Sequence, residues 1–174
     1  MHPDMKADRL QFEASLEHLY GKGVGRYLPW NRMEYVRSRR SQRMKKVLLE
    51  GRLLATIREE GSIAYSLECA RYLMKSRAFK ASCIMVNADA AQFVVQGRSL
   101  FSKHVVRAGA NVKPGLEVCL IDRQGHLLAV GRAILPRDYM GKMKSGPAVR
   151  VREGTAETAE GKNLSPATRE GVLT

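Results

Sequence analysis

Turn-forming glycines and prolines divide the second half of this 174-residue chain into short segments with strand character. Pro114-Gly115 precedes residues 116–122, and Gln124-Gly125 separates these from residues 126–135. Such dipeptides between apolar runs are typical of tight turns that join strands. The sequence therefore predicts several short strands connected by turns in this part of the chain.

A last strand is predicted at residues 148–152, where apolar and basic side chains alternate strictly. Successive side chains of a strand point to opposite faces, so Val149 and Val151 are expected to face a core. Arg150 and Arg152 are then expected to point outward. This strand would give the folded unit a basic surface.

A short helix that ends at a glycine precedes these strands. Asp89 can cap its first turn, and Ala90, Phe93 and Val94 fall on one apolar side. Gly97 is expected to end the helix, because the residue just past a helix end often needs a positive φ angle, which glycine adopts without steric cost. The chain would then turn sharply into a basic, strand-like segment.

That segment carries candidate anion-binding residues: Gly97, Arg98, Ser99, Phe101 and Lys103. Backbone amides exposed at the turn, beside Arg98 and Lys103, would suit a phosphate. Gly97 would let the ligand approach closely, and Phe101 would either offer a stacking face or lie in the core. An ordinary helix-to-strand connection would have the same local sequence, so both interpretations stay open.

The first half of the chain predicts a helix followed by a small antiparallel sheet. Apolar residues recur at helical spacing over residues 5–20. Residues 33–37, 44–49 and 53–58 have strand character, and Glu50-Gly51 suits a tight hairpin between the last two. Basic residues are dense between the first two of these strands.

Residues 32–46 contain seven Lys or Arg side chains against one acid. Arg37, Arg39, Arg40 and Arg43 are candidates to pair with phosphate oxygens, because several guanidiniums in one loop can each bind a backbone oxygen. The alternative is a solvated loop.

Three units are expected along the chain: residues 1–77, residues 78–153 and a tail at residues 154–174. A second helix, capped by Ser66, is predicted near the end of the first unit, and residues 75–80 resemble a basic connector. Beyond residue 153 the apolar periodicity disappears, which is typical of a disordered tail.

The net charge of +13 indicates a polyanionic partner, most simply a nucleic acid. A membrane surface and simple solubility are weaker alternatives, and the sequence has no basic amphipathic helix long enough for a membrane surface. The sequence also lacks an apolar run near 20 residues and a signal peptide, so we expect a cytoplasmic protein.

The cysteines and histidines do not suggest a metal site or a catalytic site. Cys69, Cys83 and Cys119 are far apart and are expected to be buried as small hydrophobic residues. The four histidines are scattered, and no acid-base or nucleophile pattern accompanies them. We therefore expect no metal, no cofactor and no catalytic residues.

Several motifs in the second half occur in an order that resembles a PUA domain, a small β-barrel module. These are CIMVNADAA, GRSLFSKHVV, VKPGLEVCLID, GHLLAVGRAIL and PAVRVR, between about residues 81 and 152. The resemblance implies RNA binding by the helix at 89–96, the turn and strand at 97–103, and residues 150–152.

The first half resembles the small α+β domain that precedes PUA in archaeal tRNA-guanine transglycosylases, the enzymes of archaeosine synthesis. The resemblance is carried by LYGKGVGRYLP and by MEYVRSRRSQRMKKVLLEGRLLATIREEGSIAYSLECARYL. Together the two resemblances predict an α+β fold class, with a small N-terminal α+β domain followed by a PUA pseudo-β-barrel.

The transglycosylases carry their chemistry on a TIM barrel of roughly 250 residues and a cysteine-rich zinc site, and neither is found in this sequence. The resemblance therefore implies a non-catalytic subunit that binds the tRNA acceptor stem and 3′ CCA end for a separate catalytic subunit. A PUA protein of ribosome assembly, translation or rRNA modification is the main alternative. An independent enzyme and a protein-interaction subunit are two others.

Overall fold

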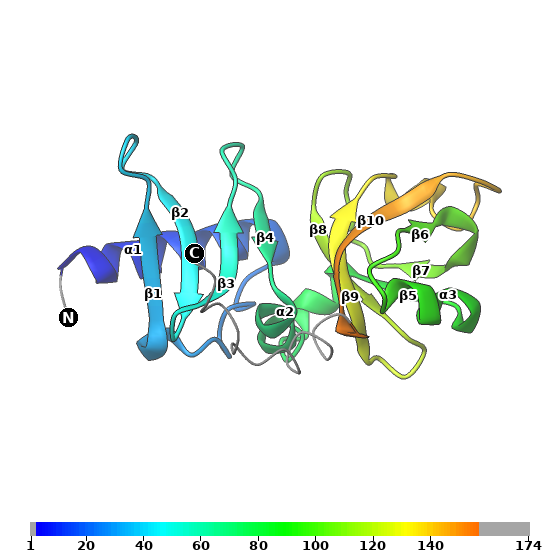
Figure 1. The fold of residues 1–174 in the computed structure, drawn as a ribbon, viewed down its shortest axis with the longest axis horizontal. Coiled ribbons are helices and arrows are strands. Elements are labelled where there is room, and N and C mark those ends of the chain that lie inside the picture. Colours follow the sequence, from blue (N-terminus) through cyan, green and yellow to red (C-terminus); the bar gives the residue numbers. More distant parts are fainter. Residues whose placement is uncertain (1–2, 157–174) are drawn as a thin grey trace, which may run out of the picture.

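The structure, a computed structural model, describes residues 3–156 and consists of two sheets, one from each half of the chain (Figure 1). The N-terminal half begins with a helix, continues through four strands and ends with a short helix. Its elements are α1 (Pro3–Tyr20), β1 (Met33–Arg37), β2 (Met44–Leu49), β3 (Arg52–Ile57), β4 (Ile63–Tyr65) and α2 (Leu67–Leu73).

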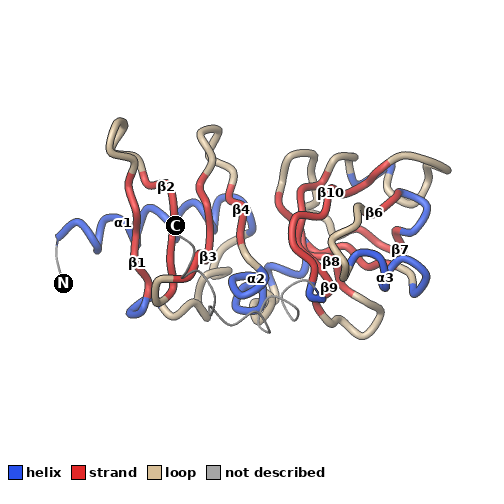
Figure 2. The backbone as a smooth tube through the Cα atoms, viewed as in Figure 1, coloured by secondary structure: helices blue, strands red, loops and turns tan. Residues whose placement is uncertain are grey.

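Helix α1 packs on one face of the antiparallel sheet β1-β2-β3-β4, and in Figure 2 it passes behind these strands. Phe12, Leu16 and Tyr20, each four residues apart, are all fully buried because this spacing places them on one side of the helix. The predicted helix is confirmed. Met5, counted among its apolar positions, is 42% exposed.

The predicted strands of this half are confirmed, with β3 starting and ending one residue earlier than expected. Glu50 and Gly51 have φ angles of 50° and 76°, which fits the tight hairpin between β2 and β3. The cap of α2 is also confirmed, since the Cys69 amide donates to the Ser66 hydroxyl at 3.2 Å.

The C-terminal half forms a six-stranded, nearly closed barrel-like sheet of order β6-β10-β9-β8-β5-β7. Its pairings are antiparallel except for the parallel pair β5–β8. The fold class predicted from the sequence, α+β with a PUA-type barrel, is confirmed. The elements are β5 (Cys83–Val86), α3 (Ala88–Val94), β6 (Leu100–Phe101), β7 (Val105–Ala108), β8 (Glu117–Ile121), β9 (Leu127–Ala133) and β10 (Pro147–Gly154).

The start of α3 differs from the prediction. The capping residue is Asn87, whose side-chain oxygen accepts from the Ala90 amide at 3.0 Å, and Asp89 lies inside the first turn. Ala90 and Val94 are buried as expected, but Phe93 is 44% exposed. Asparagine and aspartate are about equally good caps, so the sequence alone does not distinguish Asn87 from Asp89 two residues later.

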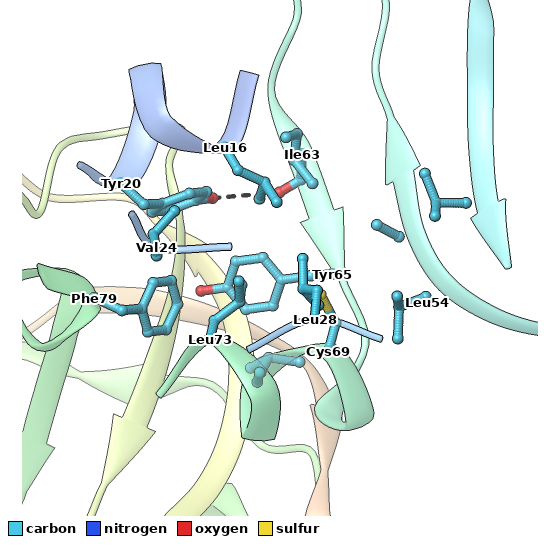
Figure 3. Packing of buried hydrophobic residues seen from close by; sticks show 14 of the residues in the cluster. Leu16, Tyr20, Val24, Leu28, Leu54, Ile63, Tyr65, Cys69, Leu73 and Phe79 are labelled. Atoms are coloured by element: carbon cyan, nitrogen blue, oxygen red, sulfur yellow. Dashed lines mark hydrogen bonds between the residues drawn. The ribbon is translucent and has the colours of Figure 1, made fainter. Parts of the chain in front are cut away.

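One apolar core joins the two halves. Tyr20, Tyr65 and Phe79 form an aromatic cluster with ring centroids 5.3 to 5.7 Å apart (Figure 3). The same core continues into the barrel, where the Tyr65 hydroxyl lies 3.7 Å from the sulfur of Cys119. The two sheets therefore share buried surface.

Phe79 lies in the segment that the sequence indicated as a basic connector. Lys75 and Lys80 are exposed there, whereas Phe79 is fully buried in a short 3₁₀ helix at Ala78–Ser82.

The unit boundaries at residues 77 and 153 stay predictions. Strand β10 continues to Gly154, and most of the predicted tail, residues 157–174, lies outside the described residues.

The three cysteines are free and buried, as predicted, and burial raises the pKa of Cys69 and of Cys119. Over residues 3–156, no helix combines the length and apolar character needed to cross a membrane.

Candidate nucleic-acid interface

The turn at Gly97 closes helix α3 with its own hydrogen bonds. Gly97 has a φ angle of 81°, as predicted, and its amide donates to the Val94 carbonyl at 3.0 Å. The Arg98 amide donates to the Phe93 carbonyl at 3.1 Å, which completes a Schellman motif. Both amides are used by the helix, so the expected backbone cradle for an anion is wrong at these two positions.

The side chain of Arg98 remains available to a ligand. It is exposed, and its guanidinium lies over the Phe93 ring, 5.6 Å from the centroid. It has no acidic partner within the described part of the chain. Phe93 lies on the apolar side of α3 by its spacing, but it is 44% exposed and carries the Arg98 cation over its ring at the surface.

Phe101 and Lys103 lie on either side of a buried serine. Phe101 is 48% exposed, which settles its position at the surface rather than in the core. Lys103 is exposed and makes no ion pair with any residue from 3 to 156. Ser102 between them is fully buried, and Ser99, in the turn, is half-buried.

The two arginines of β10 have different environments. Arg150 is exposed and lies opposite Arg132 of β9 in the strand register, with no acidic partner in the described residues. Arg152 instead donates to the carboxylate of Glu117 at 2.8 Å and to the Tyr65 carbonyl. Arg152 is therefore held at the junction between the two sheets.

Glu117 is fully buried and needs compensation for its charge. Arg58 approaches its second carboxylate oxygen at 3.4 Å, so arginines from both halves of the chain enclose it. A buried carboxylate without such partners would be strongly destabilising. The sequence did not indicate this cluster, because its members lie 35 and 59 residues from Glu117.

The basic loop between β1 and β2 is similarly divided. Arg37 donates to Asp8 of α1 at 3.0 Å and to the Gln42 carbonyl at 3.3 Å, and so fixes the base of the loop. Arg39, Arg40 and Arg43 are exposed and form no ion pair within residues 3–156.

Two groups of cations result. We call Arg98, Lys103 and Arg150 the barrel patch, and Arg39, Arg40 and Arg43 the hairpin patch. They come from opposite ends of the molecule (Figure 1), so the structure does not bring all the predicted residues together.

Neither patch has a metal-binding cluster in the described part of the chain. Among residues 3–156, no three His, Cys, Asp or Glu side chains lie close enough to hold a metal ion. His104 is held by Asn87, whose side-chain nitrogen lies 3.2 Å from the imidazole Nδ1 atom. What the arrangement offers is a set of unpaired cations and exposed aromatic rings.

The family model of the PUA domain matches residues 83–155. This part of the chain belongs to the PUA domain family. Over most of its length the chain is also similar to the C-terminal, PUA-containing portion of archaeal tRNA-guanine(15) transglycosylases. The enzyme of Thermococcus kodakarensis is 31% identical over 153 residues, which cover 87% of this chain and 26% of the enzyme. For Methanocaldococcus jannaschii the identity is 30% over 152 residues, or 86% and 23%.

The chain thus spans about a quarter of the length of these relatives.

Solved structures with the same fold match nearly the whole chain. A hypothetical protein of Pyrococcus horikoshii has a TM-score of 0.64 at 20% identity, with 86% of this chain and 90% of that chain covered. A PUA domain of Aeropyrum pernix has a TM-score of 0.61 at 18% identity, with 86% and 83% covered.

Proposed function

We propose that this chain is a non-catalytic, tRNA-binding component of an archaeal tRNA-guanine transglycosylase system. Its PUA domain supports RNA binding, and the similarity to transglycosylases over 87% of its length favours tRNA as the RNA. Its role would be to hold the tRNA while a separate catalytic subunit modifies a guanine.

The observation that carries this proposal is the lack of acidic partners in the barrel patch. Arg98, Lys103 and Arg150 are exposed and unpaired within the described residues. By contrast, Arg37 and Arg152 bind carboxylates of this chain. Exposed cations without counter-charges pair readily with phosphates, and binding then releases the condensed ions around the RNA.

The barrel patch is the proposed contact for the tRNA acceptor stem and its 3′ end. The hairpin patch would bind the phosphate backbone elsewhere on the same tRNA. Both patches consist of exposed cations that suit phosphate oxygens, in keeping with recognition of A-form RNA through its shape and its single-stranded ends.

A salt titration of tRNA binding tests the proposal. Log affinity is expected to fall steeply with log salt, and neutralising the barrel patch (Arg98→Gln, Lys103→Gln, Arg150→Gln) should lower the slope by about 2 to 3. A charge-matched control, Lys6→Gln, Lys22→Gln and Arg71→Gln, removes three exposed cations outside both patches. The control should retain most of the affinity.

Two further RNAs, tRNA without its 3′ CCA end and an rRNA fragment, test which RNA the protein prefers. Removing the 3′ CCA end from the tRNA is expected to weaken binding clearly. Equal affinity for intact tRNA, trimmed tRNA and an rRNA fragment would contradict the tRNA assignment and favour a PUA protein of ribosome assembly or rRNA modification.

A further inference from the structure

A long connection between β9 and β10 is docked on the barrel at Ser102, the residue that follows Phe101. Within residues 134–146, the Tyr139 carbonyl accepts from the Ser102 hydroxyl at 3.3 Å, and the Gly141 amide donates to the Ser102 carbonyl at 3.1 Å. The Ser102 amide in turn donates to the Gly146 carbonyl at 3.0 Å. The loop is therefore held on both sides of one buried serine.

A buried side chain of the loop, Met140, also anchors it in the barrel core. Met140 is buried and packs in the barrel core, although both neighbours in sequence, Tyr139 and Gly141, are exposed. A loop anchored by a core side chain and by several hydrogen bonds presents its outer side chains in a defined arrangement.

Those outer side chains are large apolar groups and cations. Tyr139 is 58% exposed, Met143 is 40% exposed and Phe101 is 48% exposed. The exposed cations of the same two segments are Lys103, Arg137, Lys142 and Lys144, and none forms an ion pair with a described residue. We call this surface, from residues 101–103 and 137–144, the stacking surface.

Folding does not account for this composition. A solvent-exposed tyrosine and phenylalanine bury little area within the chain, and four cations against the one carboxylate of Asp138 repel one another. Aromatic rings interleaved with cations are what single-stranded nucleic acid binds, because bases stack on the rings while phosphates pair with the charges.

We propose that the stacking surface binds unpaired nucleotides of the RNA, with Tyr139 and Phe101 as stacking partners and Lys142 and Lys144 as phosphate contacts. This inference rests on the proposed function and extends the barrel patch along β6 to the β9–β10 loop. A base inside a duplex has both faces covered by its neighbours, so the aromatic rings contribute only when the bound RNA has unpaired bases.

The experiment compares two RNAs that differ only in a 3′ single-stranded overhang on the same hairpin. Tyr139→Ala is expected to weaken binding of the overhang RNA about tenfold, the value of a typical base–aromatic stack, and to leave binding of the blunt hairpin unchanged. Tyr139→Phe keeps the ring and should bind the overhang RNA as the parent does.

Lysine substitutions provide a second measurement. Lys142→Gln with Lys144→Gln should reduce the salt slope for the overhang RNA, whereas Tyr139→Ala should leave that slope unchanged. Tyr27→Ala is the matched control, since Tyr27 is 45% exposed and has an arginine over its ring but lies in the N-terminal half.

The outcomes separate this inference from the proposed function. If the parent binds the overhang RNA and Tyr139→Ala weakens both RNAs equally or neither, the stacking surface does not hold unpaired nucleotides. A parent that binds neither RNA contradicts the proposed function itself.

Discussion

At the scale of single residues, Arg150 and Arg152 of β10 lie in different environments although they are only two positions apart. Arg150 is exposed and unpaired within residues 3–156, whereas Arg152 compensates the buried carboxylate of Glu117 and bonds the Tyr65 carbonyl. The alternation of β10 predicted an outward direction for both. It did not predict that β4 and β8 approach Arg152, because those contacts join residues distant in sequence.

This difference predicts that two similar substitutions affect different properties, one the stability of the protein and the other its RNA binding. Arg152→Met leaves Glu117 with Arg58 alone and should lower the free energy of unfolding by about 3 kcal/mol, as expected when a buried ion pair loses one member. Arg150→Met should change it by less than about 0.5 kcal/mol while weakening RNA binding. Urea denaturation measures the first quantity, and equal losses of stability in the two variants would contradict this division.

At the scale of elements, the sequence predicted most strands and helices because their signals are local. The spacing of Phe12, Leu16 and Tyr20 defined α1, and Glu50-Gly51 defined the β2–β3 hairpin. The docked β9–β10 loop was not predicted, because its anchor, Ser102, lies 37 residues from Tyr139. Two candidate interface residues, Arg152 and Arg37, bind acidic residues distant in sequence, Glu117 and Asp8, which local patterns do not predict.

Two substitutions test which residue caps helix α3, Asn87 as in the structure or Asp89 as predicted from the sequence. Asn87→Ala removes the observed cap and should destabilise the protein by about 1 kcal/mol. Asp89→Ala removes only a favourable charge from the first turn, so its cost should be smaller. Thermal unfolding of the two variants distinguishes them, and the reverse order would favour Asp89 as the cap.

At the scale of the whole molecule, buried tyrosines make stability depend on alkaline pH. Burial raises the pKa of Tyr20 and Tyr65 well above 10 and raises that of Tyr35 to about 12. Because the folded-state pKa values lie above the unfolded value, the contribution to stability is complete below about pH 10 and is lost as the pH rises further.

We therefore expect the free energy of unfolding to decrease above about pH 10. The absorbance of tyrosinate should increase cooperatively as unfolding exposes the buried tyrosines and lets them ionise. Tyr35→Phe should reduce this pH dependence, since phenylalanine does not ionise. The hydroxyl of Tyr35 is buried and has no hydrogen-bond partner among residues 3–156, so its removal should cost little at neutral pH. An unchanged pH profile in Tyr35→Phe would contradict this assignment.

The shared core around Tyr65 and Glu117 has a consequence for how the two patches act together. Once the barrel patch has engaged an RNA, the hairpin patch is presented to the same molecule at a high effective concentration. A flexible linker would allow this gain for RNAs of many sizes, whereas a packed junction allows it only where two stretches of phosphates match the distance between the patches. The junction thus makes avidity itself selective for the dimensions of the RNA.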